Sequence, residues 1–334
     1  MKTSLLPSWL VVVVLVPAWG GSAGASEDSA APSARWVLCY TSRDSEMYYA
    51  LAFPDKAHGW IVGDAGRILH SRDAGSTWAV QPSLSTNRLK CVQFVSASLG
   101  WAAGENNTVV GTRDGGGTWS LVHPPGGPLR RTFMALHFVD EQEGWLGHNH
   151  GGLVHTRDGG RTWTARDGLA REALVAVWFL NAQRGWALGV NGALLRTEDG
   201  GQNWASQRLS TQPHAVASFS TLRFLDGSRG WLGTDAAISS RAGEMPPRFG
   251  TTDGGRTWSV EGHWPGTSVR AIWFGDAQLG WCAETGGLYA TADGGRSWVR
   301  ELNSGGDPVV AMVFADKSRG WALTFTGDVY CRNE

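Results

Sequence analysis

The sequence of 334 residues has little charge and, beyond its first segment, no long apolar stretch. Charged residues make up 18% of the chain against a usual ~25%, and the formal net charge is −1. This balance gives no bulk attraction to nucleic acid or to an anionic membrane, so we expect no nucleic-acid partner. After residue 25 no run approaches the ~18 apolar residues that a membrane-spanning helix needs, so no span is expected in the rest of the chain.

Glycine and tryptophan, in contrast, are abundant, with 46 and 19 copies. A glycine inside a helix or strand costs roughly 0.5–1 kcal/mol, so this many glycines indicate frequent tight turns and exclude a helical bundle. A hydrophobic content of 42% with 10% aromatics is enough to bury a core. A disordered chain is therefore excluded as well.

The first 25 residues have the layout of a secretory signal peptide. Lys2 precedes an apolar run from Leu5 to Trp19, and small residues ending in Ala23-Gly24-Ala25 follow it. This order is typical of cleavage after Ala25, and the short apolar core favours cleavage over a retained membrane anchor. The sequence predicts a signal peptide over residues 1–25, a short linker over residues 26–34, and an exported mature chain.

The dipeptide Gly-Trp organises the rest of the chain, recurring at intervals of 41, 44, 41, 45, 50 and 40 residues. Before each copy come a short apolar segment that ends in Phe, such as residues 49–53, and then a turn. A period of ~40–50 residues with four short strands per repeat is typical of a β-propeller. The seven tryptophans that mark the repeats are Trp60, Trp101, Trp145, Trp186, Trp231, Trp281 and Trp321.

A second motif, the octapeptide S/T-x-D-x-G-x-T/S-W, closes six of the repeats, with Asn203 departing once at the seventh position. Its Asp can accept hydrogen bonds from nearby backbone N–H groups, its Gly supplies an unusual φ, and its Trp packs the turn between sheets. We interpret these aspartates as structural rather than catalytic, because a feature repeated around a ring cannot converge on one substrate. They are Asp73, Asp114, Asp158, Asp199, Asp253 and Asp293.

The seventh repeat stops after its third strand, whereas the mature N-terminus begins Arg35-Trp36-Val37-Leu38, like the segments that follow each octapeptide. We predict that this N-terminal strand completes the last blade, which removes exposed sheet edges. The expected fold is all-β, a single seven-bladed β-propeller over residues 35–334.

Two of the four cysteines fall on strands that this closure brings together. Cys39 lies on the inferred N-terminal strand and Cys331 on its expected neighbour, and an exported chain can form disulfides. A disulfide between them is a hypothesis, since the inferred register makes the two residues diagonal rather than directly opposite. Cys91 and Cys282 lie in apolar strands of different blades and are expected to be buried thiols.

The octapeptide is similar to the Asp-box of the BNR-repeat propellers. Its combination with F-x-D-x-x-x-G-W resembles the photosystem II stability/assembly factor family and its wider bacterial relatives, over roughly residues 36–334. The resemblance implies a seven-bladed propeller that acts as a non-enzymatic assembly factor and binds a membrane-protein subunit through an arginine-rich face. The matching residues belong to the scaffold, and fold does not fix function.

The loops between blades and the turns between second and third strands share one face of a propeller, and here they vary in length and content, as functional loops do. Arginines gather at the starts of the first strands, Arg223 lies inside such a strand, and Arg241 lies in an insertion in the fifth repeat. Several guanidinium groups on one face can hold the carboxylates of an acidic partner. The candidate partner-binding residues are Arg88, Arg130, Arg131, Arg171, Arg223, Arg241 and Arg270.

We expect an exported binding or assembly propeller, monomeric, with no cofactor and no catalytic residue, that engages a protein partner such as a membrane-protein segment. It would act in the periplasm or outside the cell, or in the thylakoid lumen of a phototroph. His148, His150 and His155 lack a standard zinc-ligand spacing and have no cysteine close by, so no metal site is predicted.

The alternative is a carbohydrate-active enzyme, since sialidases and some glycosidases share Asp-boxes. A sialidase-like site needs three arginines, a Tyr nucleophile and usually a YRIP or FRIP signature, and the sequence has no such signature and only five tyrosines. A glycosidase needs two carboxylates about 5–10 Å apart, and no pair of acids stands out on the face that carries the loops.

Overall fold

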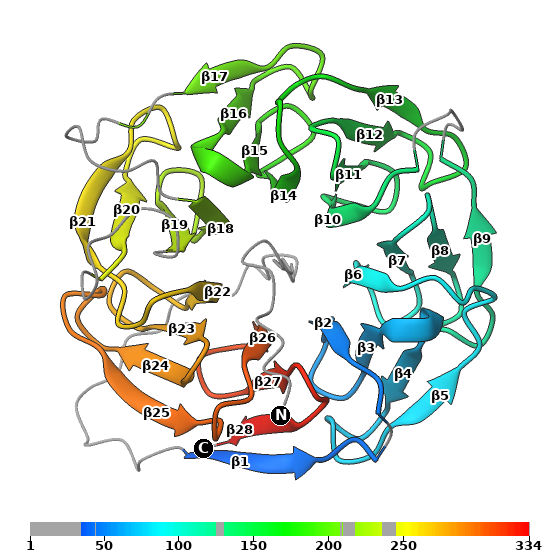
Figure 1. The fold of residues 1–334 in the computed structure, drawn as a ribbon, viewed down its shortest axis with the longest axis horizontal. Coiled ribbons are helices and arrows are strands. Elements are labelled where there is room, and N and C mark those ends of the chain that lie inside the picture. The colour runs from blue at the N-terminus through cyan, green and yellow to red at the C-terminus, as the bar shows by residue number, and fades with distance from the viewer. Residues whose placement is uncertain are drawn as a thin grey trace, which may run out of the picture.

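The structure, a computed structural model, describes residues 35–43, 45–124, 130–207, 209, 218–235 and 245–333. Seven four-stranded antiparallel sheets stand around a central axis as the blades of a propeller, which confirms the predicted fold (Figure 1). The expected signal peptide and linker lie outside the described residues. Within those residues no helix is long and apolar enough to cross a membrane.

Each blade runs from an inner strand near the axis to an outer strand at the rim (Figure 1). Blade 1 comprises β2 (Tyr48–Ala52), β3 (Gly59–Gly63), β4 (Ile68–Ser71) and β5 (Ala79–Gln81). Blade 2 comprises β6 (Leu89–Phe94), β7 (Gly100–Gly104), β8 (Val109–Thr112) and β9 (Ser120–Val122). Blade 3 comprises β10 (Phe133–Phe138), β11 (Gly144–His148), β12 (Leu153–Thr156) and β13 (Thr164–Arg166). Blade 4 comprises β14 (Leu174–Phe179), β15 (Gly185–Gly189), β16 (Leu194–Thr197) and β17 (Ala205–Gln207).

The remaining blades follow the same order. Blade 5 comprises β18 (Ser218–Phe224), β19 (Gly230–Asp235), β20 (Pro247–Thr251) and β21 (Ser259–His263). Blade 6 comprises β22 (Val269–Phe274), β23 (Gly280–Glu284), β24 (Gly287–Thr291) and β25 (Val299–Asn303). Blade 7 comprises β26 (Val309–Phe314), β27 (Gly320–Thr324), β28 (Val329–Asn333) and β1 (Arg35–Tyr40). Two short 3-10 turns, η1 (Asp64–Gly66) and η2 (Val190–Gly192), join second to third strands.

Blade 7 is closed by the first strand of the chain, as the sequence predicted. β1 pairs antiparallel with β28, with Val37 opposite Cys331, and the two strands lie side by side in Figure 1. Trp36 takes the place of the Asp-box Trp that this blade lacks: it is 7% exposed and meets Phe314 edge-on, with ring centroids 5.7 Å apart. In the other six blades the Asp-box Trp meets the Phe of its own blade in the same edge-on manner.

The tryptophan of each Gly-Trp pair connects its blade to the next. Trp60 of blade 1 stacks on Phe94 of blade 2 with centroids 3.6 Å apart. An equivalent Trp–Phe pair meets at every boundary, with the rings tilted by 30° and 31° at Trp186 and Trp281, and Trp321 of blade 7 stacks on Phe53 of blade 1 at 3.8 Å to complete the circle. All seven of these tryptophans are at most 2% exposed, so each boundary holds a buried pair of aromatic rings.

The glycine of Gly-Trp is required by the close approach of the Phe ring. At Gly144 an added Cβ would lie 2.4 Å from the ring of Phe138 in the same blade, and the equivalent glycines of the other six blades meet their own Phe in the same way. Each Phe ring is therefore held between the glycine of its own blade and the tryptophan of the preceding blade.

Cys39 and Cys331 are joined by a disulfide, with Cα atoms 5.9 Å apart, that ties β1 to β28. Cys39 lies at a β-bulge between Leu38 and Tyr40, diagonal to the cysteine that it meets. The other two cysteines, Cys91 and Cys282, are buried and unpaired. Burial raises the pKa of the Cys91 thiol to about 12, so it is inert as a nucleophile at neutral pH.

The packing of Phe against Gly predicts that Gly144→Ala destabilises the propeller by about 1–3 kcal/mol, because the ring of Phe138 has to move out of its stack on Trp101. Urea unfolding followed by fluorescence measures this loss. Gly227→Ala is the control, since a Cβ there meets only the end of Leu180 at 3.6 Å. Equal midpoints for the two variants would show that the contact does not limit stability.

The disulfide joins two cysteines that are 292 residues apart in the sequence. Replacing both by serine should therefore lower the free energy of unfolding by about 2–5 kcal/mol. Thermal unfolding of the double variant, and of the wild-type protein with and without reductant, measures the effect. Unfolded wild-type protein should show two reactive thiols before reduction and four afterwards. Four reactive thiols without reductant would contradict the pairing.

Candidate functional site

The Asp-box aspartates are the most numerous acidic candidates, and each is engaged by its own hairpin. In the first box, Asp73 Oδ1 accepts from the hydroxyl of Ser71 at 2.9 Å and from the backbone N–H of Thr77 at 2.8 Å, while Oδ2 accepts from the hydroxyl of Thr77 at 2.6 Å. The other five boxes repeat this pattern, and Asn203 replaces the hydroxyl by donating from Nδ2 to Asp199 at 2.8 Å.

Each Asp-box also holds the turn between the first and second strands of its blade. In blade 3 the backbone N–H of Gly159 donates to the carbonyl oxygen of Gln142 at 2.9 Å, and the other boxes make the equivalent bond. The six boxes thus belong to six blades and share one end of the propeller, which we call the Asp-box face. Their carboxylates are spread around the ring and committed to local bonds, an arrangement that holds hairpins in place.

The opposite end carries the loops between blades and the turns between second and third strands, and we call it the loop face. Arg88, in the loop between blades 1 and 2, illustrates how these elements meet. Its Nε lies 2.7 Å from Asp64 of the blade 1 turn, and its Nη1 lies 3.5 Å from Glu105 of the blade 2 turn. Asp64 also accepts from the hydroxyl of Tyr49 at 2.7 Å. Arg88 therefore bridges two blades with its charge compensated.

Arg131 is placed differently from the exposed loop residue that its sequence suggests. Its side chain is 5% exposed and lies 3.0 Å from Asp167 of the next inter-blade loop. Asp167 also lies 3.1 Å from the Nε2 of His148, whose side chain is fully buried. Burial lowers the pKa of His148 to about 4, so this imidazole is neutral at pH 7. The three residues fix the loops of blade 3 to one another.

Two of the candidate arginines, Arg130 and Arg171, are exposed on the loop face. Neither has a carboxylate partner among the residues that the structure describes. They lie shortly before the inner strands of blades 3 and 4, near in sequence to Arg131 and Asp167, of which Arg131 is buried and Asp167 is exposed. Exposed guanidinium groups near the ends of paired strands are available to bind an external anion.

The remaining candidates do not join this pair. Arg270 is 7% exposed within β22. Arg223 lies at the other end of its inner strand, next to Phe224 and close to the Asp-box face, with its guanidinium 4.8 Å from the ring centroid of Trp178. Arg241 lies outside the described residues. The structure therefore places Arg88, Arg130, Arg131, Arg171 and Arg270 on the loop face and separates Arg223 from them.

Lys90 is a loop-face cation that sequence reasoning missed. Its Nζ lies 3.5 Å from the centroid of the Tyr49 ring, and burial lowers its pKa to about 8. Lys90 lies four residues before the Phe of its strand, where every inner strand has a register shift against its neighbour. Arg270, a candidate from the sequence, holds the same position in blade 6, so aligning the seven repeats on their Phe would also have found Lys90.

The three histidines within residues 148–155 of blade 3 each have a separate partner. His148 faces Asp167, His150 Nε2 lies 3.3 Å from the carbonyl oxygen of Arg130, and His155 Nε2 lies 3.1 Å from Glu143. In the described part of the chain no group of three or more His, Cys, Asp or Glu side chains is arranged to hold a metal ion.

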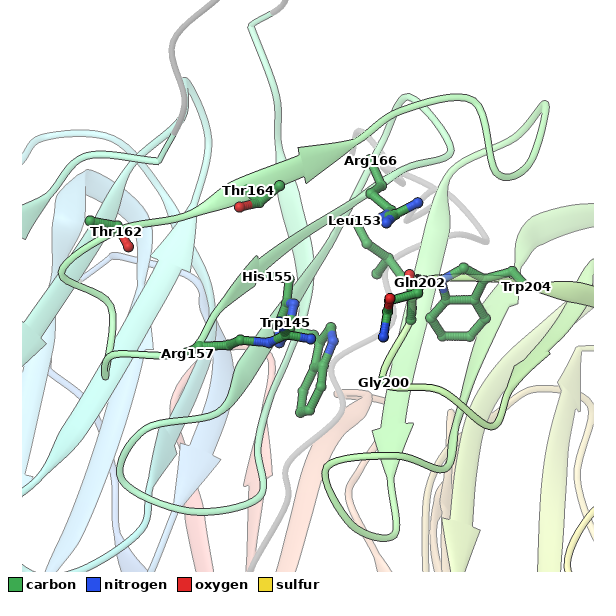
Figure 2. Close-up of a pocket in the computed structure, with 11 residues that line it drawn as sticks. Trp145, Leu153, His155, Arg157, Thr162, Thr164, Arg166, Gly200, Gln202 and Trp204 are labelled. Carbon is green, nitrogen blue, oxygen red and sulfur yellow. Dashed lines mark hydrogen bonds between the residues drawn. The ribbon is translucent and has the colours of Figure 1, made fainter.

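A pocket of ≈ 330 Å³ lies between the outer parts of blades 3 and 4, away from the arginine pair of the loop face. Trp145, His155, Arg157 and Arg166 line it from blade 3, and the Asp-box of blade 4 forms the opposite wall with Gly200, Gly201, Gln202 and Trp204 (Figure 2). The pocket therefore combines indole edges with basic side chains.

A family model described as photosynthesis system II assembly factor YCF48 matches residues 29–129 and 169–330. The unmatched stretch covers blade 3. No curated protein is similar enough to the chain to count as a match.

Solved structures share the fold. YCF48 from Cyanidioschyzon merolae is 20% identical, with a TM-score of 0.70 over 90% of this chain and 99% of that one. A structure of YCF48 bound to D1 peptide is 19% identical, with a TM-score of 0.70 over 96% and 100% of the two chains. The WD40 β-propeller domain of Doa1 is 10% identical, with a TM-score of 0.69 over 90% and 97%.

The Asp-box hydrogen bonds predict a loss of stability in acid. Bonds from the backbone and side chain of Thr118 lower the pKa of Asp114 to about 2, and those from Thr162 do the same for Asp158. An unfolded Asp has a pKa of about 3.9, so the stabilisation is complete above that pH and is lost as the pH falls toward about 2. The thermal midpoint should drop across this range and drop less in D114N/D158N; equal slopes would contradict the assignment.

Proposed function

Because the chain belongs to the family of photosynthesis system II assembly factor YCF48, we propose that it is a non-enzymatic binding or assembly factor that engages a protein partner through the loop face. Family membership supports a scaffold that binds rather than one that catalyses. The Asp-box carboxylates fit this reading, since all six are occupied by hydrogen bonds within their own hairpins.

The pair of exposed arginines carries the assignment to the loop face. Arg130 and Arg171 present guanidinium groups on adjacent blades that have no carboxylate partner among the described residues, and the contact of buried Arg131 with Asp167 joins the loops before these two blades. A guanidinium group pairs with a carboxylate through two parallel hydrogen bonds, which gives direction as well as strength. Lys90 adds a third positive group on the same face.

The partner that suits this face is an acidic or extended segment of a protein, such as the exposed part of a membrane protein. The solved structure of YCF48 bound to D1 peptide supports this class of partner, because in it a protein of the same fold binds a peptide. The arginines supply charge for the acidic groups, and the turns that surround them supply backbone hydrogen-bonding groups.

The layout of the first 25 residues supports export of the protein, which would act as a monomer in the periplasm or outside the cell, or in the thylakoid lumen of a phototroph. The disulfide between Cys39 and Cys331 supports the same assignment, since such bonds persist in oxidising compartments. No cofactor is part of this proposal.

Charge reversal of Arg130 and Arg171 tests the proposed face. We expect the R130E/R171E variant to capture at most about one tenth of the partner that the wild-type protein captures. An acidic segment would meet two carboxylates instead of two guanidinium groups. Immobilised protein is incubated with the exported fraction of its own organism, and the retained proteins are quantified by mass spectrometry.

R256E/R296E is the matched control, since it makes the same change of charge at exposed arginines of two Asp-boxes. The control variant should retain the partner, and both variants should keep the wild-type thermal midpoint to within about 2 °C. Equal retention by R130E/R171E and the wild-type protein would overturn the assignment to the loop face.

A further inference from the structure

At two boundaries between blades, a glutamine of the outer strand bonds at the rim to the next blade. This residue is the third after the Asp-box Trp. Between blades 1 and 2 it is Gln81, whose Nε2 donates to the carbonyl oxygen of Gly115 at 3.4 Å and whose Oε1 accepts from the indole N–H of Trp119 at 3.1 Å. Between blades 4 and 5 it is Gln207, which donates to the carbonyl oxygen of Gly255 at 2.9 Å.

Between blades 3 and 4 the equivalent residue is Arg166, and it leaves the boundary open. It makes no hydrogen bond and no salt bridge with any residue that the structure describes. Its diagonal neighbour, His155, cannot bridge the gap, because its Nε2 lies 3.1 Å from Glu143 and its ring stacks on Trp145 with centroids 4.7 Å apart. The pocket of ≈ 330 Å³ lies at this boundary, lined by Arg166 on one side and by the Asp-box of blade 4 on the other.

Trp145 contributes a buried N–H group to this pocket. The side chain is 1% exposed, and its Nε1 has no acceptor among the described residues. Because one face of the indole lies against Phe179 and the other against His155, only its edge is open to the pocket. Figure 2 shows the indole nitrogen on the side of the ring that faces Gln202. A buried donor without a partner is stabilised by any acceptor that reaches it.

The charge of the pocket is positive. Arg157 and Arg166 both line it, and Glu143 is the carboxylate beside them, with its Oε1 3.5 Å from the Nε of Arg157. Burial lowers the pKa of His155, so this imidazole is neutral at pH 7. Arg166 is therefore the group whose charge is left uncompensated.

We propose that this inter-blade pocket binds a carboxylate, which pairs with Arg166 and accepts a hydrogen bond from the indole N–H of Trp145. The volume suits a group of the size of a glutamate side chain, and the carboxylate can belong to a free dicarboxylic acid or to an acidic side chain of a protein. The site is separate from the arginines of the loop face. Seven of its eleven lining residues lie in blade 3, outside the residues that match the family.

Titration of the whole mature protein with matched acids and amides, followed by ligand-observed NMR, tests the pocket. The two acids are glutarate and a blocked glycine–glutamate–glycine peptide, and their neutral counterparts are glutaramide and the glutamine peptide. We expect saturable binding of at least one acid, at least tenfold tighter than that of its amide. Binding of glutarate alone identifies a free acid as the ligand, and binding of the peptide alone identifies an acidic side chain.

R166Q is the decisive variant, because it removes the charge and installs the residue that closes the boundaries after blades 1 and 4. It should weaken binding of the acid about tenfold or more, while R161Q, on the Asp-box of the same blade, should leave binding unchanged. Thermal midpoints check that both variants fold, and R157Q provides a second test within the pocket. Equal affinity for acid and amide, or unchanged binding by R166Q, would overturn the proposal.

Discussion

The architecture depends on one contact that is repeated around the ring: a Phe side chain held between the glycine of its own blade and the tryptophan of the blade before it. The glycine has to lack a side chain, because a Cβ there would enter the Phe ring. The tryptophan has to be large enough to cross the boundary, which it does with ring separations of 3.5–4.6 Å. Because the last of these stacks joins blade 7 to blade 1, the contact sets the spacing of all seven blades.

The fold could be predicted from the sequence because these contacts use the same residue types in every repeat. Gly-Trp, the preceding Phe and the Asp-box each recur, so a single alignment places the strands and shows that Trp36 belongs to the last blade. The cysteine pair follows the same logic: Cys39 and Cys331 hold the positions that Gln81 and His70 hold in blade 1, where the two side chains hydrogen-bond at 3.0 Å.

The candidate site was less predictable, because loop side chains have partners that the repeat does not encode. Arg130 and Arg131 are neighbours in the sequence, yet only Arg131 is buried, since Asp167 from the next inter-blade loop reaches it. Arg223 lies in the expected strand but at the far end of it. The open boundary beside Arg166 lies at a position where blades 1 and 4 carry glutamine, which is visible only after the outer strands are aligned.

The pairing of β1 with β28 has a consequence for the order in which the molecule can form. Ribosomal synthesis delivers β1 first and β28 last, so the strand that closes the ring waits for nearly the whole chain. Until β28 is made, β1 has no partner strand in its sheet. Until β1 then pairs with β28, the outer edge of β28 is unpaired and can bind any extended segment nearby. Blades 1 to 6 are built from strands that are consecutive in the chain, and only the seventh requires the two ends to meet. The circle is therefore completed by the strand pair of greatest sequence separation, and contacts of this kind are slow to form.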